Sequence, residues 1–405
     1  MATYKEQNKL NVPHLRFPEF EEEWNIKTLG SLSKGIGDGI HATPIYDDNG
    51  SYYFINGNNL SERGINISEA TKRVSKEEAY KNNAAILNDR TILLSINGTI
   101  GNVALYNNEP IMLGKSACYI NVSPHINKHY VYHYLQTNKC QTYFKSELTG
   151  TTIKNLSLQS VRNVKIALPS IYEQNRIAKL LDVIDEHIAT QSKLIEKLES
   201  LIKGIMVELQ KQGVNKGTWK KVFLSDVLTE RNERNTNLFQ VFSVSVSQGV
   251  VNQVDYLGRS FAAKDTSKYN VVHYGDLVYT KSPTGSFPYG IVKQSLSLEN
   301  VAVSPLYGVY KPQSLAAGAY LHEYFMSEIN THNYLHPLIQ KGAKNTINIT
   351  NQRFLENCVL LPTNINELLL ISKMLRSLND KLKYQQDTLQ KYQKQKKYLL
   401  RQMFI

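Results

Sequence analysis

Residues 153–169 read IKNLSLQSVRNVKIALP, and residues 347–362 read INITNQRFLENCVLLP. A long helical pattern follows each stretch at once. Upstream, each copy opens with a tryptophan, in WNIKTLGSL from Trp24 and in WKKVFLSDVL from Trp219. The offset between matching residues stays between 193 and 195. A constant offset indicates two copies of one structural unit. We therefore predict a duplicated unit, in which a globular part of about 150 residues precedes a helix of about 40.

The two helical patterns have heptad-like spacing. Apolar residues recur at steps of four and three from Ile177 to Leu209, and again from Ile371 to Met403. Such a repeat over about five heptads is typical of a coiled-coil seam, although a helix packed only on its own domain is the alternative. The predicted helix-pairing seam contains Leu181, Ile188, Gln191, Ile195, Leu375, Leu382, Gln385 and Leu389.

Polar residues interrupt both seams at the same place. Gln191 and Gln385 are 194 residues apart, which is the repeat offset. A buried polar pair costs stability but selects one register between two helices. The coincidence therefore favours the two helices as partners of each other, although glutamine is also common on helix surfaces.

Prolines mark where the long helices begin. Pro169 and Pro362 each precede one of them, and proline disfavours helix in the residue before it. The globular parts show short strand-like runs separated by Gly, Asn, Asp and Pro, which indicates an α+β fold. The strand-like runs are Tyr52–Ile55, Thr91–Leu94, Ala117–Ile120, Val241–Val246 and Leu277–Tyr279, and the helical segments are Ile126–Phe144 and Ala319–His332. The predicted divisions are residues 1–170, 171–212, 213–365 and 366–405.

Composition narrows the class of protein. The 405 residues carry a net charge of +12, which points to an anionic partner, nucleic acid before membrane. Half of this surplus lies on residues 366–405, with nine basic and three acidic residues. The sequence contains no run of about 18 apolar residues, so we expect no membrane span. Its polar start leads us to expect no export signal. Three cysteines without a CxxC pair fit a reducing cytoplasm.

Patterns that would carry catalysis are weak. The glycine-rich run Gly35–Gly39 has no apolar helix after it, and Gly114-Lys115-Ser116 ends like a phosphate loop but has Glu109 where the loop needs glycine. His125, His129 and His133 recur every four residues without the glutamate of a metalloprotease motif. Carboxylates do not cluster as a Mg²⁺-dependent nuclease requires. We therefore predict a chain without catalytic residues, metal or cofactor of its own.

Loops rich in Ser, Thr, Asn and Lys recur at matching places in the two halves. Short hydroxyl, amide and ammonium side chains on glycine-containing loops suit contacts to phosphates and base edges, although ordinary turns use the same residues. The candidate DNA-binding residues of the first half are Ser95, Asn97, Thr99, Thr151, Thr152, Lys154 and Asn155. Those of the second half are Lys281, Ser282, Thr284, Ser286, Lys341, Lys344, Asn345 and Thr346.

Three segments resemble the DNA specificity subunit of type I restriction-modification systems. The start Val12–Phe20, followed by Glu23-Trp24 and Leu29-Gly30, is similar to the usual start of that family. The loop Ser95–Gly101 is similar to a glycine motif of its recognition domains. The stretch Asn155–Pro169, followed by Glu173-Gln174, resembles the junction with its conserved helix. Asn366-Glu367 stands where the second half should have Glu-Gln, so this junction departs from the pattern.

The resemblance implies a non-catalytic protein with two target recognition domains, each reading half of a bipartite, asymmetric DNA site. Two long antiparallel helices would separate these domains in a pseudo-twofold arrangement. About 40 helical residues span ~60 Å, which is under two turns of B-DNA. Two methyltransferase subunits that bind S-adenosylmethionine, and restriction subunits that use ATP and Mg²⁺, would assemble on the chain.

Two other classes of protein stay open from the residues alone. A self-contained DNA enzyme, such as a nuclease with a duplicated fold, would need a carboxylate cluster that the sequence does not display. A coiled-coil scaffold without a DNA role would show no salt-dependent DNA binding.

Overall fold

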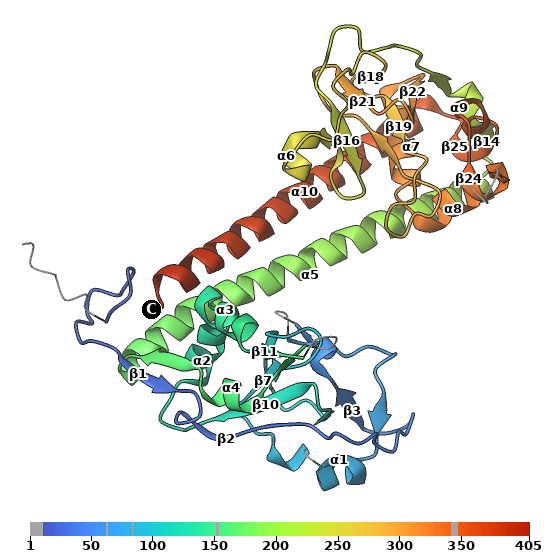
Figure 1. Ribbon diagram of the computed structural model, residues 1–405. Coiled ribbons are helices and arrows are strands. Elements are labelled where there is room, and N and C mark those ends of the chain that lie inside the picture. Colours follow the sequence, from blue (N-terminus) through green and yellow to red (C-terminus); the bar gives the residue numbers. More distant parts are fainter. Residues whose placement is uncertain (1–10, 62–63, 83, 151–153, 342–346) are drawn as a thin grey trace, which may run out of the picture. The chain divides into compact units, whose positions relative to one another are not determined.

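The computed structural model describes residues 11–61, 64–82, 84–150, 154–341 and 347–405. These residues form two compact units. The first consists of Met1–Lys193 together with Asp387–Ile405, and the second of Leu194–Gln386. Each unit combines short strands with helices (Figure 1), which confirms the predicted α+β class.

A four-stranded antiparallel sheet forms the centre of the first unit. Its order is β2 (Ser33–Asp38), β10 (Ala117–Val122), β7 (Thr91–Ser95) and β8 (Val103–Leu105). All five residues of β7 are buried, as expected for a continuous apolar run in a central strand. A second sheet has the order β6 (Arg73–Val74), β3 (Tyr52–Ile55) and β9 (Ile111–Leu113). The strand pairs are β1 (Asn25–Thr28) with β13 (Lys165–Leu168), β4 (Leu60–Ser61) with β5 (Gly64–Ile65), and β11 (Leu148–Thr149) with β12 (Asn155–Leu156).

The sheet of the second unit has the same order when its four strands are ranked along the chain, namely first, fourth, second and third. It runs β15 (Leu228–Glu230), β22 (Gly308–Pro312), β19 (Leu277–Tyr279) and β20 (Val292–Gln294). Its strand pairs are β14 (Trp219–Phe223) with β25 (Cys358–Pro362), β16 (Phe242–Ser245) with β17 (Gly249–Asn252), β18 (Asn270–Val272) with β21 (Val301–Val303), and β23 (Gln340–Lys341) with β24 (Ile347–Asn348). The strands predicted at Tyr52–Ile55, Thr91–Leu94, Ala117–Ile120 and Leu277–Tyr279 are confirmed, and Val241–Val246 contains β16.

The predicted helical segments Ile126–Phe144 and Ala319–His332 are wrong as single helices. The first region folds as α2 (Lys128–Leu135) and α3 (Asn138–Ser146), because Thr137 caps α3 by accepting a hydrogen bond from the Cys140 N–H at 3.3 Å. The second folds as α7 (Leu315–Tyr324) and α8 (Glu328–Leu335), with Ser327 as the cap. The remaining short helices are α1 (Lys76–Asn82), α4 (Leu158–Arg162), α6 (Gln253–Leu257) and α9 (Asn351–Phe354), and the 3₁₀ turns are η1 (Gly57–Asn59), η2 (Ala84–Ile86), η3 (Leu224–Asp226) and η4 (His336–Leu338).

Two long helices begin close to the predicted prolines. Helix α5 covers Ile171–Asn215, and helix α10 covers Ile365–Gln402. Each contributes to both units, because the division falls after Lys193 in α5 and after Gln386 in α10. Within the first unit, the end of α10 therefore shares a core with the beginning of α5. Within the second unit, the beginning of α10 shares a core with the end of α5.

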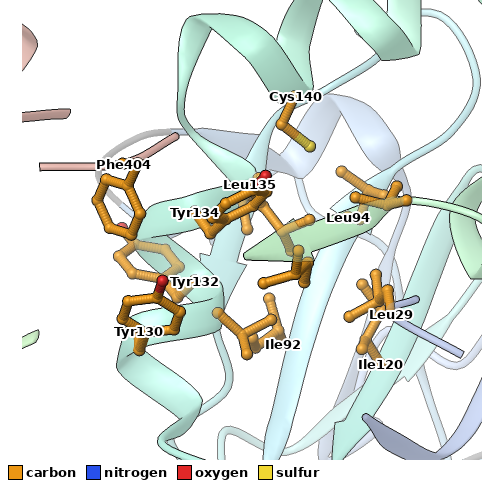
Figure 2. Close-up of a cluster of buried hydrophobic side chains, with 14 of the residues drawn as sticks. Leu29, Ile92, Leu94, Ile120, Tyr130, Tyr132, Tyr134, Leu135, Cys140 and Phe404 are labelled. Atoms are coloured by element: carbon orange, nitrogen blue, oxygen red, sulfur yellow. The ribbon is translucent and has the colours of Figure 1, made fainter. Parts of the chain in front are cut away.

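The core of the first unit is closed by the last residues of the chain. Phe404 lies beside Tyr130 and Tyr134 of α2, with ring centroids 5.3 and 5.6 Å apart (Figure 2). Leu181 of α5 and Met403 belong to the same buried cluster. Residues distant in sequence thus complete one apolar core.

The glycine-rich run Gly35–Gly39 has a packing explanation. Most of it lies in β2, where a Cβ on Gly37 would meet the Tyr119 hydroxyl at 2.6 Å.

No helix in the described part of the chain combines the length and apolarity needed to cross a bilayer.

Candidate nucleic-acid interface

Two of the predicted DNA-binding loops meet in the first unit. The loop Ser95–Gly101 leaves the end of β7, and Asn155 begins β12. Asn97 and Asn155 form an isolated antiparallel bridge, and the Leu156 N–H donates to the Ile96 carbonyl at 2.9 Å. Tertiary structure therefore joins Asn97 and Asn155, which are 58 positions apart in the chain.

The side chains of this pair of loops divide into buried and accessible ones. Ser95 is fully buried, and its hydroxyl lies 3.3 Å from that of Thr99. The Thr99 hydroxyl donates to the Gly57 carbonyl at 2.9 Å, although the residue as a whole is exposed. Asn97 is half-buried and Lys154 is exposed. Thr151 and Thr152 lie outside the described residues.

The matching loop of the second unit follows β19. Lys281 has a left-handed backbone with φ +59° and is half-buried. Burial lowers the pKa of Lys281, and the nearby carboxylate of Glu230 opposes this effect. Ser282 is exposed, whereas Thr284 pairs with Phe287 through two backbone hydrogen bonds of 3.0 Å. The Ser286 hydroxyl donates to the carboxylate of Glu328, so it is already used within the unit.

The second loop predicted for this unit is only partly described. Lys341 ends β23, and its backbone pairs with Ile347 of β24. Lys344, Asn345 and Thr346 lie outside the described residues.

Sequence analysis missed a third segment beside the loops of the first unit. This is the turn η1 with its preceding residue Asn56, which the Thr99 hydroxyl contacts through the Gly57 carbonyl. Ser116, in the Gly114-Lys115-Ser116 run noted from sequence, donates its hydroxyl hydrogen to Asn56 Oδ1 at 2.9 Å. The available signal was the absence of acidic residues in both segments.

The helix-pairing residues are mostly withdrawn from solvent within their own units. Leu181 and Leu375 are fully buried, and Ile188 and Leu382 pack at the edges of the two cores. Gln191 is 7% exposed and Ile195 9% exposed, whereas Gln385 and Leu389 are half-buried. Because Gln191 and Gln385 belong to different units, their predicted meeting stays a prediction.

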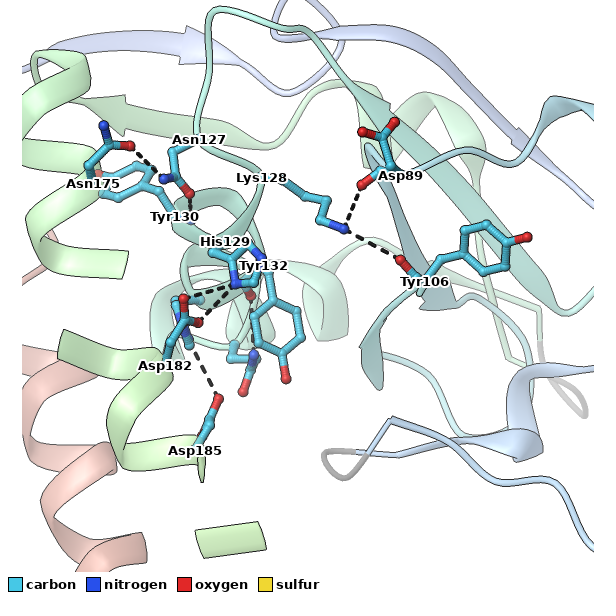
Figure 3. A network of polar contacts seen from close by, with 12 residues as sticks. Asp89, Tyr106, Asn127, Lys128, His129, Tyr130, Tyr132, Asn175, Asp182 and Asp185 are labelled. Atoms are coloured by element: carbon cyan, nitrogen blue, oxygen red, sulfur yellow. Dashed lines mark hydrogen bonds and ion pairs between the residues drawn. The ribbon is translucent and has the colours of Figure 1, made fainter. Parts of the chain in front are cut away.

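A polar cluster joins α2 to α5 inside the first unit (Figure 3), and Lys396 connects this cluster to α10. Asp182 of α5 lies 3.0 Å from Nδ1 of His129 and 2.9 Å from Nε2 of His133. Lys396 of α10 contacts the next carboxylate of α5, Asp185, at 2.6 Å. Two of the three histidines that recur every four residues, His129 and His133, thus face a carboxylate. Among the described residues, no group of three His, Cys, Asp or Glu side chains has the arrangement of a metal site.

Burial controls the protonation of this cluster. His133 is fully buried, and burial lowers its pKa below 6.5, so the neutral ring donates from Nε2 to Asp182. Burial by itself would raise the pKa of Asp182, but hydrogen bonds from His129 and His133 hold that pKa below its ordinary value. This network fastens α2 to α5, and the ion pair of Lys396 with Asp185 adds α10.

The face of α5 in the second unit carries accessible apolar side chains. Leu194 is 43% exposed and Leu201 49% exposed, seven residues apart on one helix face. Leu201, Gly204 and Ile205 line a shallow hollow together with Lys197, Ser200 and Glu208. Exposed apolar groups in a row are a feature of surfaces that bind other proteins.

Comparisons with known proteins agree with this architecture. Residues 21–200 match the family described as Type I restriction modification DNA specificity domain. Over those residues, the match agrees with the family resemblance noted from sequence.

Similar curated proteins are named specificity subunits of type I restriction enzymes. The Type I restriction enzyme MjaVIII specificity subunit of Methanocaldococcus jannaschii is 29% identical over 53% of this chain and 47% of its own length. The Type I restriction enzyme EcoR124I/EcoR124II specificity subunit of Escherichia coli is 26% identical over 45% of each chain. The chain therefore aligns with about half of the length of these relatives.

A solved structure extends the likeness in fold. The type I restriction-modification S subunit from M. genitalium matches with a TM-score of 0.65 and 14% identity, over 97% of this chain and 99% of that one. At this identity the likeness concerns the fold alone.

Proposed function

We propose that this chain is the DNA-reading subunit of a type I restriction-modification complex and recognises a bipartite, asymmetric site. The match of residues 21–200 to a DNA specificity domain carries the proposal. The equal strand order of the two sheets supports two reading modules related by a pseudo-twofold repeat, one in residues 1–170 and one in residues 213–365.

The two long helices would act as an antiparallel coiled coil that sets the distance between the modules. Residues 171–212 form the central element, and residues 366–405 pair with it. Helices of 45 and 38 residues correspond to roughly 57–68 Å, about two turns of B-DNA. Shared cores of α5 with α10 in each unit support this arrangement.

Partner subunits would supply the chemistry. Two methyltransferase subunits would bind S-adenosylmethionine, and restriction subunits would use ATP and Mg²⁺, so this chain positions the reaction without catalysing it. The exposed apolar face of α5 at Leu194 and Leu201 is the surface that we assign to a methyltransferase subunit. The complex would act on DNA in the cytoplasm.

Direct DNA contacts in the first module would come from Asn97, Thr99, Lys154 and Asn155, and in the second from Lys281 and Ser282. Thr99, Lys154 and Ser282 are exposed, whereas Asn97, Asn155 and Lys281 are half-buried. Ser95 is buried and would hold its loop in shape. The basic residues of the C-terminal helix would strengthen binding through phosphates or through an acidic face of a partner.

Binding and methylation assays test the proposal. The chain is co-purified with its methyltransferase subunit, and N6-methyladenine is mapped in DNA from cells that express both. We expect methylation at one split sequence and DNA binding that weakens steeply as salt rises, because phosphate neutralisation releases counterions. A flat salt response would favour a scaffold, and DNA cleavage by the chain alone with Mg²⁺ would favour a nuclease.

A further inference from the structure

Three segments of the first unit converge at Gly57. A Cβ on this residue would lie 2.4 Å from Ser95 Oγ, 2.8 Å from the Ser116 carbonyl and 3.0 Å from the Asn97 carbonyl. The turn η1, the loop after β7 and the turn before β10 therefore touch at one point. Only glycine has room there, because each of these distances is far below an ordinary Cβ contact.

Hydroxyl groups tie the three segments together. The Gly57 N–H donates to Ser116 Oγ at 2.8 Å, and the Thr99 hydroxyl donates to the Gly57 carbonyl at 2.9 Å. The Ile96 N–H donates to the Ser116 carbonyl at 3.0 Å. These bonds hold the backbone of three loops with short side chains, which leaves the longer side chains of the same loops available.

Two longer side chains on these segments point into solvent without a partner among the described residues. Asn58 is exposed in the middle of η1, and Lys115 is exposed at the turn before β10. Neither forms a hydrogen bond or ion pair with any part of the chain that the structure describes. Asn58 directly follows Gly57, and Lys115 directly precedes Ser116.

The charge of this surface suits an anion. Residues 56–59, 95–101 and 114–116 contain no acidic residue and include Lys115, while the adjoining residue Lys154 adds a second exposed cation. Another hollow of the same unit is more acidic, since Asp47, Glu77 and Glu78 line it together with Lys81. The surface around Gly57 is therefore the better suited of the two to phosphates.

We propose that Asn58 and Lys115 extend the DNA-reading surface of the first module, with Lys115 contacting a phosphate and Asn58 reading a base edge. The amide of asparagine can donate and accept together, which suits adenine, whereas an ammonium group binds phosphate as a point charge. The inference rests on the proposed function. It assigns the specificity of one half-site to η1 in addition to the loops after β7 and before β12.

The test uses the complex with the methyltransferase subunit and two labelled duplexes of equal length, one with the mapped methylation site and one with its bases shuffled. Asn58→Ala should weaken binding to the site duplex about tenfold, leave the shuffled duplex unaffected, and relax methylation at one position of one half-site. Lys115→Gln should weaken binding to both duplexes and reduce the slope of log K against log salt by about one.

Matched controls come from the acidic side of the same unit. Asn49 and Lys81 are exposed, and the variants Asn49→Ala and Lys81→Gln should bind both duplexes as the parent does. Thermal unfolding of all variants should equal that of the parent, since none of the four side chains is buried.

Three results would overturn the inference. If Asn58→Ala and Lys115→Gln match the parent in affinity, salt slope and methylated sequence, the surface does not read DNA. If they impair only assembly with the methyltransferase, the surface binds protein. If the parent complex does not distinguish the two duplexes, the proposed function fails as well, which separates that failure from the first two.

Discussion

Trp219 donates a 2.9 Å hydrogen bond from its indole Nε1 to Oε1 of Glu367 in the first turn of α10. In the first unit, Trp24 donates to Glu173 in the first turn of α5 at 3.2 Å. The two pairs span 148 and 149 residues, so each unit fastens its entering segment to the start of a long helix. The Trp24–Glu173 pair has one further partner, because Arg16 also donates to Glu173 at 2.7 and 2.9 Å.

Glu173→Gln should destabilise the first unit by about 3 kcal/mol, because it leaves the nearly buried guanidinium of Arg16 without its counter-charge. The side chains of Arg16 and Glu173 are only 13% and 2% exposed. Glu367→Gln should cost the second unit only about 1 kcal/mol, since the amide Oε1 can still accept from the Trp219 indole and the hydrogen bond loses only the strengthening that a charged acceptor gives. Hydrogen exchange measured separately for the two units gives both values, and equal losses would contradict the role of Arg16.

Acidification should destabilise the first unit through His133. Because burial lowers the pKa of His133 in the folded chain, the unfolded chain binds this proton at higher pH, and the free energy of unfolding falls as the pH decreases below about 6.5. The charged groups that face this ring are Asp182 and Asp185 from α5 and Lys396 from α10, with His129 on the same carboxylate.

His133→Gln keeps a donor for Asp182 but removes the titration, so thermal melts from pH 7.5 to 5.5 should show a smaller loss of stability. His125→Gln, at an exposed position before α2, should retain the full loss. An unchanged pH dependence in the His133 variant would exclude this histidine as the cause.

Phe404→Ala should lower the stability of the first unit by about 3 kcal/mol, because it removes a ring packed against Tyr130 and Tyr134. Tyr398→Ala, in the last turns of α10, is the matched control, since Tyr398 is 52% exposed and its loss should change stability by under about 0.5 kcal/mol. Urea unfolding of the two variants compares these values, and a Phe404 effect no larger than the control would show that the chain end contributes little.

Lengthening both long helices should change the spacer of the methylated site and leave its half-sites unaltered. Four residues inserted after Lys193 in α5 and four after Gln386 in α10 add ~6 Å of helix, or about two base pairs. Mapping of N6-methyladenine reads the spacer directly. Substituting four residues at the same places without insertion is the control. Altered half-site bases would contradict the proposal that the helices set the spacer and the modules read the half-sites.

Local pattern accounts for much of the fold. The prolines at 169 and 362 and the 4-3 spacing after them predicted α5 and α10 to within a few residues at their starts. The apolar runs predicted β7 and β19, because a central strand buries every side chain. The helix breaks at Thr137 and Ser327 were not predicted. In a sequence, a Ser or Thr that caps a helix cannot be told from one inside a helix, because the difference lies in the hydrogen bond that its hydroxyl accepts.

The sequence by itself determined the repeat, the α+β class and the long helices, since these depend on spacing along the chain. Only the tertiary structure decided which of the predicted loop residues are accessible: it buries Ser95, exposes Thr99, and brings Gly57 and Ser116 beside them. It also placed Phe404 in a core that begins hundreds of residues earlier. The physical reason is that these relationships come from contacts between residues far apart in sequence, which periodicity and propensity do not encode.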